Sequence, residues 1–159
     1  MFPSSGHDHE RCRSAALRTA AALCSGRGAR LTPIRRRVLE IVWGSHTAIG
    51  AYQVMDALRE DHGAVTPPTV YRALDFLMAQ GLVHRVASLN AYIGCSRPAE
   101  GHPGQFLICR GCHQTLEVDD KQPAEAVEAI ARRQGFTVER SEIEVHGLCA
   151  SCRKGAGRA

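Results

Sequence analysis

The 159-residue sequence lacks two features that would each assign it to a broad class of protein. No run approaches the roughly 20 consecutive apolar residues that a membrane-spanning helix requires, so we expect no membrane partner. No charged leader with an apolar core and a cleavage site precedes the seven cysteines, which are an odd number, so secretion with a disulfide framework is disfavoured. These absences together predict a cytoplasmic protein whose cysteines are reduced.

Sequence signatures of common enzyme classes are also missing. The chain has neither the nucleophile-elbow motif of acyl transfer nor a glycine-rich loop that cradles phosphates. A zinc ion held entirely by protein side chains has no open position for a catalytic water. We therefore expect a protein that is not an enzyme and has no small-molecule substrate, with a thiol oxidoreductase or a zinc hydrolase as the alternatives.

The sequence does contain two cysteine pairs with the same spacing. Cys109 and Cys112 lie in CRGC, and Cys149 and Cys152 lie in CASC. One such pair alone could be a redox dithiol, half of a metal site or two unrelated thiols. Two matched pairs on separate hairpins can place four thiolates about 2.3 Å from one Zn²⁺. We therefore predict a structural zinc site, which would help a small domain to fold.

Basic residues gather in the N-terminal half, although the net charge is only +4. The segment RGARLTPIRRR, residues 27–37, suits contact with a phosphate backbone, and Arg30 and Arg36 are its candidate DNA contacts. The same run could equally form a solvated helix face, so the charge pattern alone does not decide between the two.

Helix-capping residues and apolar spacing predict a mainly helical N-terminal half. Thr32 is a predicted N-cap with Pro33 at the first helical position, and Thr66 with Pro67 repeats this arrangement. Gly81 then ends the second of these helices. Composition and apolar spacing place the helices at residues 14–24, 33–43, 51–61 and 67–80.

Two strand-like runs follow the last of these helices. LVHRV at residues 82–86 and AYIGC at residues 91–95 are joined by a short connection, which predicts a β-hairpin. Helices followed by such a hairpin indicate a winged helix-turn-helix domain over residues 14–95.

The helix that begins at Pro67 has the pattern of a recognition helix. Its buried stripe is Val70, Leu74, Leu77 and Met78. Thr69, Tyr71 and Arg72 must then point away from the core. Arg72 could contact guanine or a phosphate and Tyr71 a thymine methyl or a phosphate. A half-buried interhelix tyrosine and a solvated arginine remain the alternatives.

The C-terminal part has a different pattern. Residues 96–104 are rich in proline and glycine and predict a hinge. Strand-like runs at residues 105–109, 115–118 and 136–147 surround an amphipathic helix at residues 123–134, with Val127 and Ile130 expected inside. We interpret residues 105–152 as a small α+β domain held by zinc, which makes the whole chain α+β. Residues 1–13 and 153–159 are expected to be a disordered N-terminus and a flexible tail.

Six motifs in order, LTPIRRRVL, PPTVYRALDFL, GLVHRV, AYIGC, FLICRGC and HGLCASC, make the chain similar to the ferric uptake regulator superfamily. Its zinc-sensing branch, the zinc uptake regulators, is the most similar. The resemblance implies a homodimer whose N-terminal winged-helix domains bind double-stranded operator DNA and whose C-terminal domains dimerise. It also implies that zinc loading switches the protein onto operators and so represses zinc-uptake genes.

The same resemblance implies an interdomain sensory zinc site at His84, Cys95, His102 and Glu117, and so two Zn²⁺ per chain. A single histidine on a strand or a single buried cysteine is more often an ordinary structural residue. Thiolate with imidazole suits Zn²⁺ or Cu(I), so Cys95 disfavours iron. The alternative is a regulator of the same family that senses another metal or peroxide and uses zinc only for structure.

The remaining histidines are not expected to be metal ligands, and they are His7, His9, His46, His62, His113 and His146. The sequence assigns no role to Cys12 or Cys24.

Overall fold

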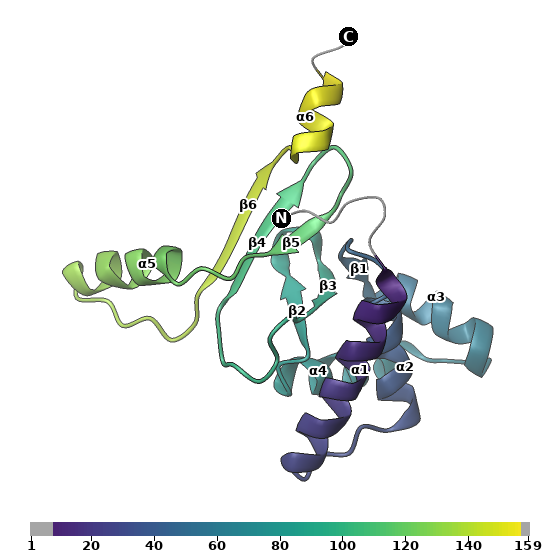
Figure 1. Ribbon diagram of the computed structural model, residues 1–159. Coiled ribbons are helices and arrows are strands. Elements are labelled where there is room, and N and C mark those ends of the chain that lie inside the picture. Colours follow the sequence, from purple (N-terminus) through teal and green to yellow (C-terminus); the bar gives the residue numbers. More distant parts are fainter. Residues whose placement is uncertain (1–7, 157–159) are drawn as a thin grey trace. The chain divides into compact units, whose positions relative to one another are not determined.

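The computed structural model describes residues 8–156, which form two compact units (Figure 1). The first unit ends at Gly101 and the second begins at His102. The division lies within residues 96–104, the segment expected to be a hinge. Among the described residues no helix is long and apolar enough to cross a membrane.

Over its described residues, 8–101, the first unit combines four α-helices with a small antiparallel sheet. Its helices are α1 (His9–Gly26), α2 (Pro33–Val42), α3 (Ala51–His62) and α4 (Pro67–Ala79). Its strands are β1 (Ile49–Gly50), β2 (Val83–Val86) and β3 (Ala91–Gly94), in the order β1-β3-β2, with the 3₁₀ turn η1 (Ala87–Leu89) between β2 and β3. The predicted hairpin is therefore present as β2 and β3, and the unit is a winged helix.

Both predicted threonine–proline helix starts are confirmed. The Thr32 hydroxyl accepts a hydrogen bond from the backbone N–H of Arg35 at 3.5 Å, and Thr66 is the N-cap of α4. After α4, Gly81 adopts a φ of +68°, a left-handed conformation that favours glycine over other residues. The starts of α2 and α4 and the end of α4 are thus set by the backbone conformation of the few residues at each position.

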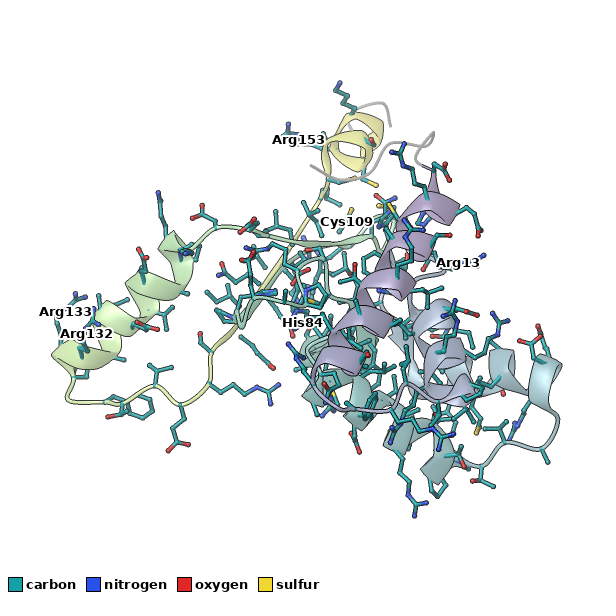
Figure 2. The ribbon with its side chains drawn as sticks, turned by 60° about the horizontal axis from the view of Figure 1, so that its bottom comes forward. Arg13, His84, Cys109, Arg132, Arg133 and Arg153 are labelled. Carbon is teal, nitrogen blue, oxygen red and sulfur yellow. The ribbon has the colours of Figure 1, made fainter. Side chains whose placement is uncertain are left out.

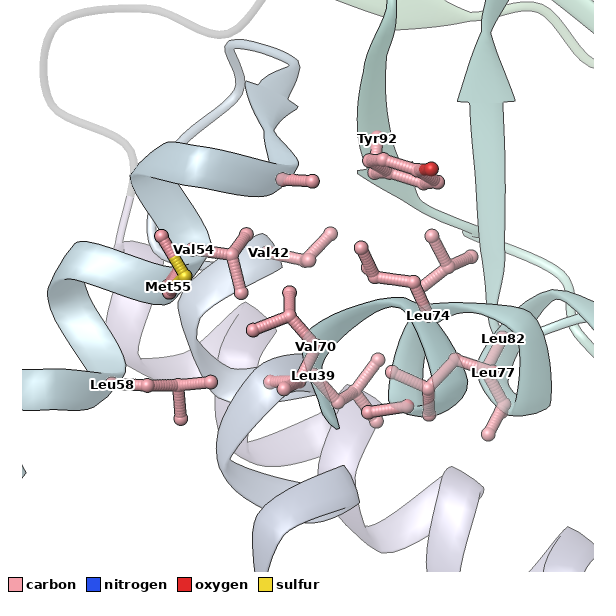
Figure 3. Close-up of a cluster of buried hydrophobic side chains, with 14 of the residues drawn as sticks. Leu39, Val42, Val54, Met55, Leu58, Val70, Leu74, Leu77, Leu82 and Tyr92 are labelled. Atoms are coloured by element: carbon pink, nitrogen blue, oxygen red, sulfur yellow. The ribbon is translucent and has the colours of Figure 1, made fainter. Parts of the chain in front are cut away.

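The core of the first unit lies where α4 packs against α2 and α3 (Figure 3). Val70, Leu74 and Leu77 of α4 are buried, as the apolar stripe predicted, together with Leu39 and Leu58. Each buried aliphatic side chain contributes about 1.5–3 kcal/mol relative to exposure. Because this stripe faces inward, the opposite side of α4 has to face outward.

Strand β3 is packed tightly against the residue that follows α2. The indole ring of Trp43 occupies the space that a Cβ atom at position 94 would need. Gly94 is therefore required for this close approach. The contact fixes the wing relative to α2 immediately before Cys95.

From residue 102 to residue 156, where its description ends, the second unit is a three-stranded sheet with two helices. Its elements are β4 (Gly104–Cys109), β5 (Thr115–Glu117), α5 (Gln122–Arg133), β6 (Glu142–Gly147) and α6 (Ala150–Ala156). The strand order is β5-β4-β6, with β5 antiparallel and β6 parallel to the central β4. Phe106 and Ile108 of β4 are buried. Together with the winged helix, this unit confirms the α+β class.

Helix α5 departs from the prediction. Val127 and Ile130 are 39% and 53% exposed, and no residue of α5 is buried. The expectation that they lie inside is wrong, because α5 stands clear of the sheet of its own unit (Figure 1). An amphipathic helix in a single chain therefore presents its apolar stripe to the outside.

The last strand is shorter than residues 136–147. Strand β6 begins at Glu142, which pairs with Gly104, the first residue of β4. Residues 136–141 lie beyond the start of β4, so they have no neighbouring backbone to pair with there. The alternation of apolar and polar residues along 136–147 could not show where within this run the strand begins.

Both chain ends contain more helix than expected. Helix α1 begins at His9, and the Asp8 side chain caps it by accepting from the N–H of Arg11 at 3.1 Å, so residues 9–13 are not disordered. At the other end, residues 153–156 belong to α6 and are not a free tail. Residues 1–7 and 157–159, where the remaining predictions of disorder fall, lie outside the described residues.

Candidate metal centres and nucleic-acid interface

The four paired cysteines meet at one edge of the second unit. Cys109 ends β4, Cys112 lies in the turn to β5, and Cys149 and Cys152 follow β6. Because β4 and β6 are parallel neighbours, with Cys109 opposite Gly147, both cysteine pairs emerge at the same end of the sheet. The four sulfur atoms all lie within 4.8 Å of one another.

The spacing of these sulfurs fits a tetrahedral zinc site. The Sγ atoms of Cys112 and Cys149 are 3.8 Å apart. Four sulfurs about 2.3 Å from a central Zn²⁺ would be separated by about 3.8 Å from one another. This donor set and spacing match a closed, structural zinc site with no open position.

The backbone around the first pair is shaped by the second pair. The N–H of Cys149 donates to Sγ of Cys109 at 3.3 Å, and the N–H of Arg110 donates to the carbonyl of Gly147 at 2.8 Å. A Cβ at Gly111 would lie 2.9 Å from Cβ and Sγ of Cys152, so only glycine fits there. Local contacts thus hold the two CxxC segments together.

The thiols differ in acidity because of these contacts. Hydrogen bonds from backbone N–H groups, that of Cys149 first, lower the pKa of Cys109 to about 6. Its sulfur neighbours, Cys149 first, raise the pKa of Cys152 to about 12. Thiolates this close repel one another, so complete ionisation of the cluster requires a cation among them.

The second pair differs from the prediction in one respect. Cys149 and Cys152 lie at the junction of β6 and α6, and not on a hairpin. The sequence could not distinguish the two, because the short segment ASCRKGA carries little helical periodicity. His113 has a φ of 60° and is exposed, and His146 is exposed too.

His84 and Cys95 share one face of the wing hairpin in the first unit. His84 pairs with Ile93, and the N–H of Cys95 donates to the carbonyl of Leu82 at 3.0 Å, which extends the same register. Cys95 lies opposite Leu82, and residues opposite one another in a ladder point to the same side of the hairpin. Leu82 and His84 are two positions apart along one strand and also share a side, so Leu82, His84 and Cys95 all point the same way. Cys95 is 3% exposed and His84 is half-buried.

His102 and Glu117 are in direct contact in the second unit. The His102 Nε2 and Glu117 Oε1 atoms are 2.7 Å apart, and the two side chains are only 12% and 6% exposed. A nitrogen and a carboxylate oxygen held this way are suitable donors for one metal ion. Each unit therefore carries two of the four predicted sensory residues close to each other.

The predicted DNA contacts of α4 lie on its outer side. Tyr71 is 40% exposed and Arg72 is exposed, while Thr69 is half-buried with its hydroxyl 3.0 Å from that of Thr66. No described acidic side chain pairs with Arg72. Its guanidinium group is therefore available for an anionic partner.

The arginines before and within α2 differ in their exposure and in the groups that they contact. Arg30, one of the predicted DNA contacts, is exposed. Arg36 forms an ion pair with Glu40 at 3.3 Å, so part of its charge is already balanced. Arg35 was not singled out in the sequence, but its guanidinium lies 3.6 Å from the centre of the Phe76 ring. The basic run at residues 27–37 contains Arg35, but nothing in the sequence distinguishes it from its neighbours Arg36 and Arg37.

Comparison with known proteins places the chain in a family. The model of the ferric uptake regulator family matches residues 26–146. The chain belongs to the ferric uptake regulator family. Within this family, the zinc uptake regulation protein of Escherichia coli is 40% identical over 139 residues, which cover 86% of this chain and 80% of that protein. The zinc uptake regulation protein of Mycobacterium tuberculosis is 30% identical, covering 81% of this chain and 98% of the relative.

Solved structures of the ferric uptake regulator family show the same similarity. A zinc uptake regulator complexed with zinc and DNA matches with a TM-score of 0.86 at 38% identity, covering 91% of this chain and 97% of the other. The holo form of a protein called XcZur matches with a TM-score of 0.81 at 44% identity, covering 88% and 98%. Among the relatives found by sequence, the peroxide-responsive repressor of Staphylococcus saprophyticus is more distant, at 25% identity.

Proposed function

We propose that this protein is a zinc-responsive transcriptional repressor that binds operator DNA as a homodimer and controls zinc-uptake genes. The observation that carries the proposal is the similarity, over nine-tenths of the chain, to a zinc uptake regulator solved with zinc and DNA. Two donor groups suited to zinc and an outward-facing recognition helix support it from the chain's own residues. Membership of a family of transcription regulators also agrees with the absence of enzyme motifs from the sequence.

We assign two zinc sites to each chain. Cys109, Cys112, Cys149 and Cys152 would hold a structural ion. His84 and Cys95 of the first unit, together with His102 and Glu117 of the second, would hold a sensory ion. The support is that each of these pairs is already positioned within its own unit and that sulfur, nitrogen and oxygen donors together suit Zn²⁺ better than iron.

A zinc ion in the sensory site would link the two units. His84 and Cys95 would hold the winged helix, and His102 and Glu117 the second unit, so the angle across residues 96–104 becomes restricted. In a dimer, this angle sets the separation of the two recognition helices, which has to match successive major-groove half-sites. Such coupling is commonly worth about 1–3 kcal/mol, and it requires that operator DNA tighten zinc binding in return.

A second copy of the chain is the partner that we assign to the apolar surface of the second unit. Val127 and Ile130 on α5, Phe136, and Val145 on β6 are all exposed, from 39% to 65%. Apolar surface of this extent on one small unit is typical of a protein–protein interface. The helix stripe that a single chain leaves uncovered would be buried between two copies.

For DNA contact, we assign Thr69, Tyr71 and Arg72 on α4, with Arg30 on the neighbouring loop. Arg36 would contribute less than its position indicates, because Glu40 competes for its charge. We also assign the protein to the cytoplasm, where operator DNA and reduced thiols occur together.

A zinc-titrated DNA-binding curve tests this function. Purified protein is stripped of its weakly held metal and titrated with Zn²⁺, Fe²⁺ or Mn²⁺ against duplexes selected from a random pool. We expect zinc alone to tighten binding to the selected sequence by about 5- to 150-fold. Equal responses to iron or manganese would indicate a regulator for another metal, and selection of no preferred sequence would refute the function.

A further inference from the structure

A groove in the first unit lies between the N-terminal ends of α2 and α4. It has a volume of about 230 Å³ and is lined by Thr32, Ile34, Arg35, Thr69, Arg72 and Ala73. Ile34 and Ala73 supply apolar surface, and the other residues supply two hydroxyls and two guanidinium groups. No acidic residue is part of this lining. The groove therefore suits a ligand with one apolar part and one anionic part.

Arg35 is held in place before any ligand arrives. Its guanidinium lies 3.6 Å from the centre of the Phe76 ring, and its Nη1 donates to the carbonyl of Arg30 at 2.6 Å. Neither partner neutralises its charge. Little side-chain entropy is then lost when this arginine binds an anion, because its position is already fixed.

The neighbouring arginines of α2 are in a different electrostatic state. Arg36 pairs with Glu40, and Arg37 pairs with Glu40 and Asp61. Burial, the largest single influence, lowers the pKa of Arg37, but the hydrogen bonds that Arg37 donates to the Asp61 and Glu40 carboxylates, and their negative charge, raise it above its ordinary value. Of these three consecutive arginines, Arg35 alone combines a fixed position with a charge that no described carboxylate balances.

The hydroxyl groups of the groove retain hydrogen-bonding capacity. The Thr32 oxygen accepts from the N–H of Arg35, which leaves its O–H able to donate. Thr69 and Thr66 share one hydrogen bond between their hydroxyls. The N-terminal ends of α2 and α4 add partial positive charge on the same side.

We propose that this groove binds one sugar–phosphate unit of the DNA backbone. The phosphate would lie between Arg35 and Arg72 beside the Thr69 hydroxyl, and the deoxyribose would pack against Ile34 and Ala73. The proposal rests on the DNA-binding function and deepens it, because it assigns a backbone-positioning role to Arg35. Half to two-thirds of protein–DNA hydrogen bonds go to phosphate and sugar, and such contacts set the register of a recognition helix.

Salt dependence of DNA binding tests the charge of the groove. Arg35→Gln should weaken binding to a zinc-selected duplex and to a random-sequence duplex by the same factor, about tenfold or more. It should also lower the slope of log affinity against log salt by about 1, as expected for one lost phosphate contact. Arg35→Lys keeps the charge but loses the planar fork, so it should restore the slope and only part of the affinity.

The matched control is Arg132→Gln on α5. Arg132 lies in the last turn of α5 in the second unit (Figure 2), so its replacement removes the same charge without altering any residue that lines the groove. It should leave both affinity and slope unchanged. Thr69→Val, which replaces a hydroxyl by a methyl of the same shape, tests the groove independently if Arg35→Gln lowers the melting temperature. It should reduce affinity for both duplexes without changing the slope.

Neutralising single phosphates of the duplex then locates the contact. Methylphosphonate at each position in turn should weaken the wild type at several phosphates. Arg35→Gln should be insensitive at one of these and additive at the others. Additive losses at every position, an unchanged salt slope, or an effect confined to one base substitution would each overturn the backbone site.

The two proposals fail in distinguishable ways. If the wild type selects no sequence and shows no response to zinc, the regulatory function is wrong. The salt slope of Arg35→Gln on random-sequence DNA would still decide whether the groove binds phosphate. If the wild type responds to zinc and Arg35→Gln behaves as wild type, only the groove is wrong.

Discussion

Replacing Cys95 by serine should separate sensing from folding. Cys95 is 3% exposed, so the serine hydroxyl would be buried, at a cost of about 1–3 kcal/mol if it finds no partner. A domain of ordinary stability, about 5–15 kcal/mol, tolerates this loss. The backbone hydrogen bond from residue 95 to Leu82 is unaffected, because it does not use the side chain. We therefore expect a folded dimer that keeps its four-cysteine zinc.

The effect on function should be much larger than the effect on stability. Serine is a poor substitute for the soft thiolate, so the sensory site should lose its zinc while the structural site keeps its own. If zinc couples to DNA with about 1–3 kcal/mol, its loss weakens operator binding by about 5- to 150-fold at zinc concentrations that saturate the wild type. His84→Ala and His102→Ala should behave similarly. Glu117→Ala should be the mildest, because water readily replaces a carboxylate ligand.

Cys24→Ser is a matched control for this experiment. Cys24 is 1% exposed in the same unit, and burial, as the main cause, raises the pKa of its thiol. It should cost a similar amount of stability without changing metal content. Zinc per chain is measured by mass spectrometry under native conditions, and DNA binding by fluorescence anisotropy during a zinc titration. If the Cys95 and Cys24 variants share one zinc dependence, the sensory site at Cys95 is refuted.

Three further changes test other parts of the structure. Cys109→Ser should lose one zinc per chain and leave the second unit without stable structure, since metal-binding energy here is folding energy; a folded, zinc-replete dimer would contradict the structural site. Ile130→Asp should weaken dimerisation by about tenfold or more in sedimentation experiments, because it places a charge in the apolar stripe of α5. An unchanged dimer would assign that stripe to another partner. Gly94→Ala should lower stability by about 1–3 kcal/mol in thermal unfolding, because the methyl would displace the Trp43 indole, and an unchanged melting temperature would show that the indole moves freely.

Local chemistry explains why much of the fold could be predicted from the sequence. The N-caps at Thr32 and Thr66 depend on the few residues around them, and the buried stripe of α4 depends on a spacing along one helix. The two CxxC pairs similarly indicate a shared metal, because four soft ligands at this spacing have few other uses. The residues alone did not show whether His84, Cys95, His102 and Glu117 bind a metal. Their assignment to a sensory zinc site came from the resemblance to a family.

Contacts between residues distant in the sequence decided the rest. Whether the stripe of α5 is buried depends on what packs against it, and one chain provides no cover for Ile130. The start of β6 at Glu142 is set by where β4 begins, and the position of Arg35 is set by Phe76 on another helix. The ability of residues to form helices, strands and metal ligands is a local property, so it could be predicted from the amino-acid sequence. Which of their surfaces remain open to DNA or to a second chain depends on every element that packs nearby, so it became visible only in the folded protein.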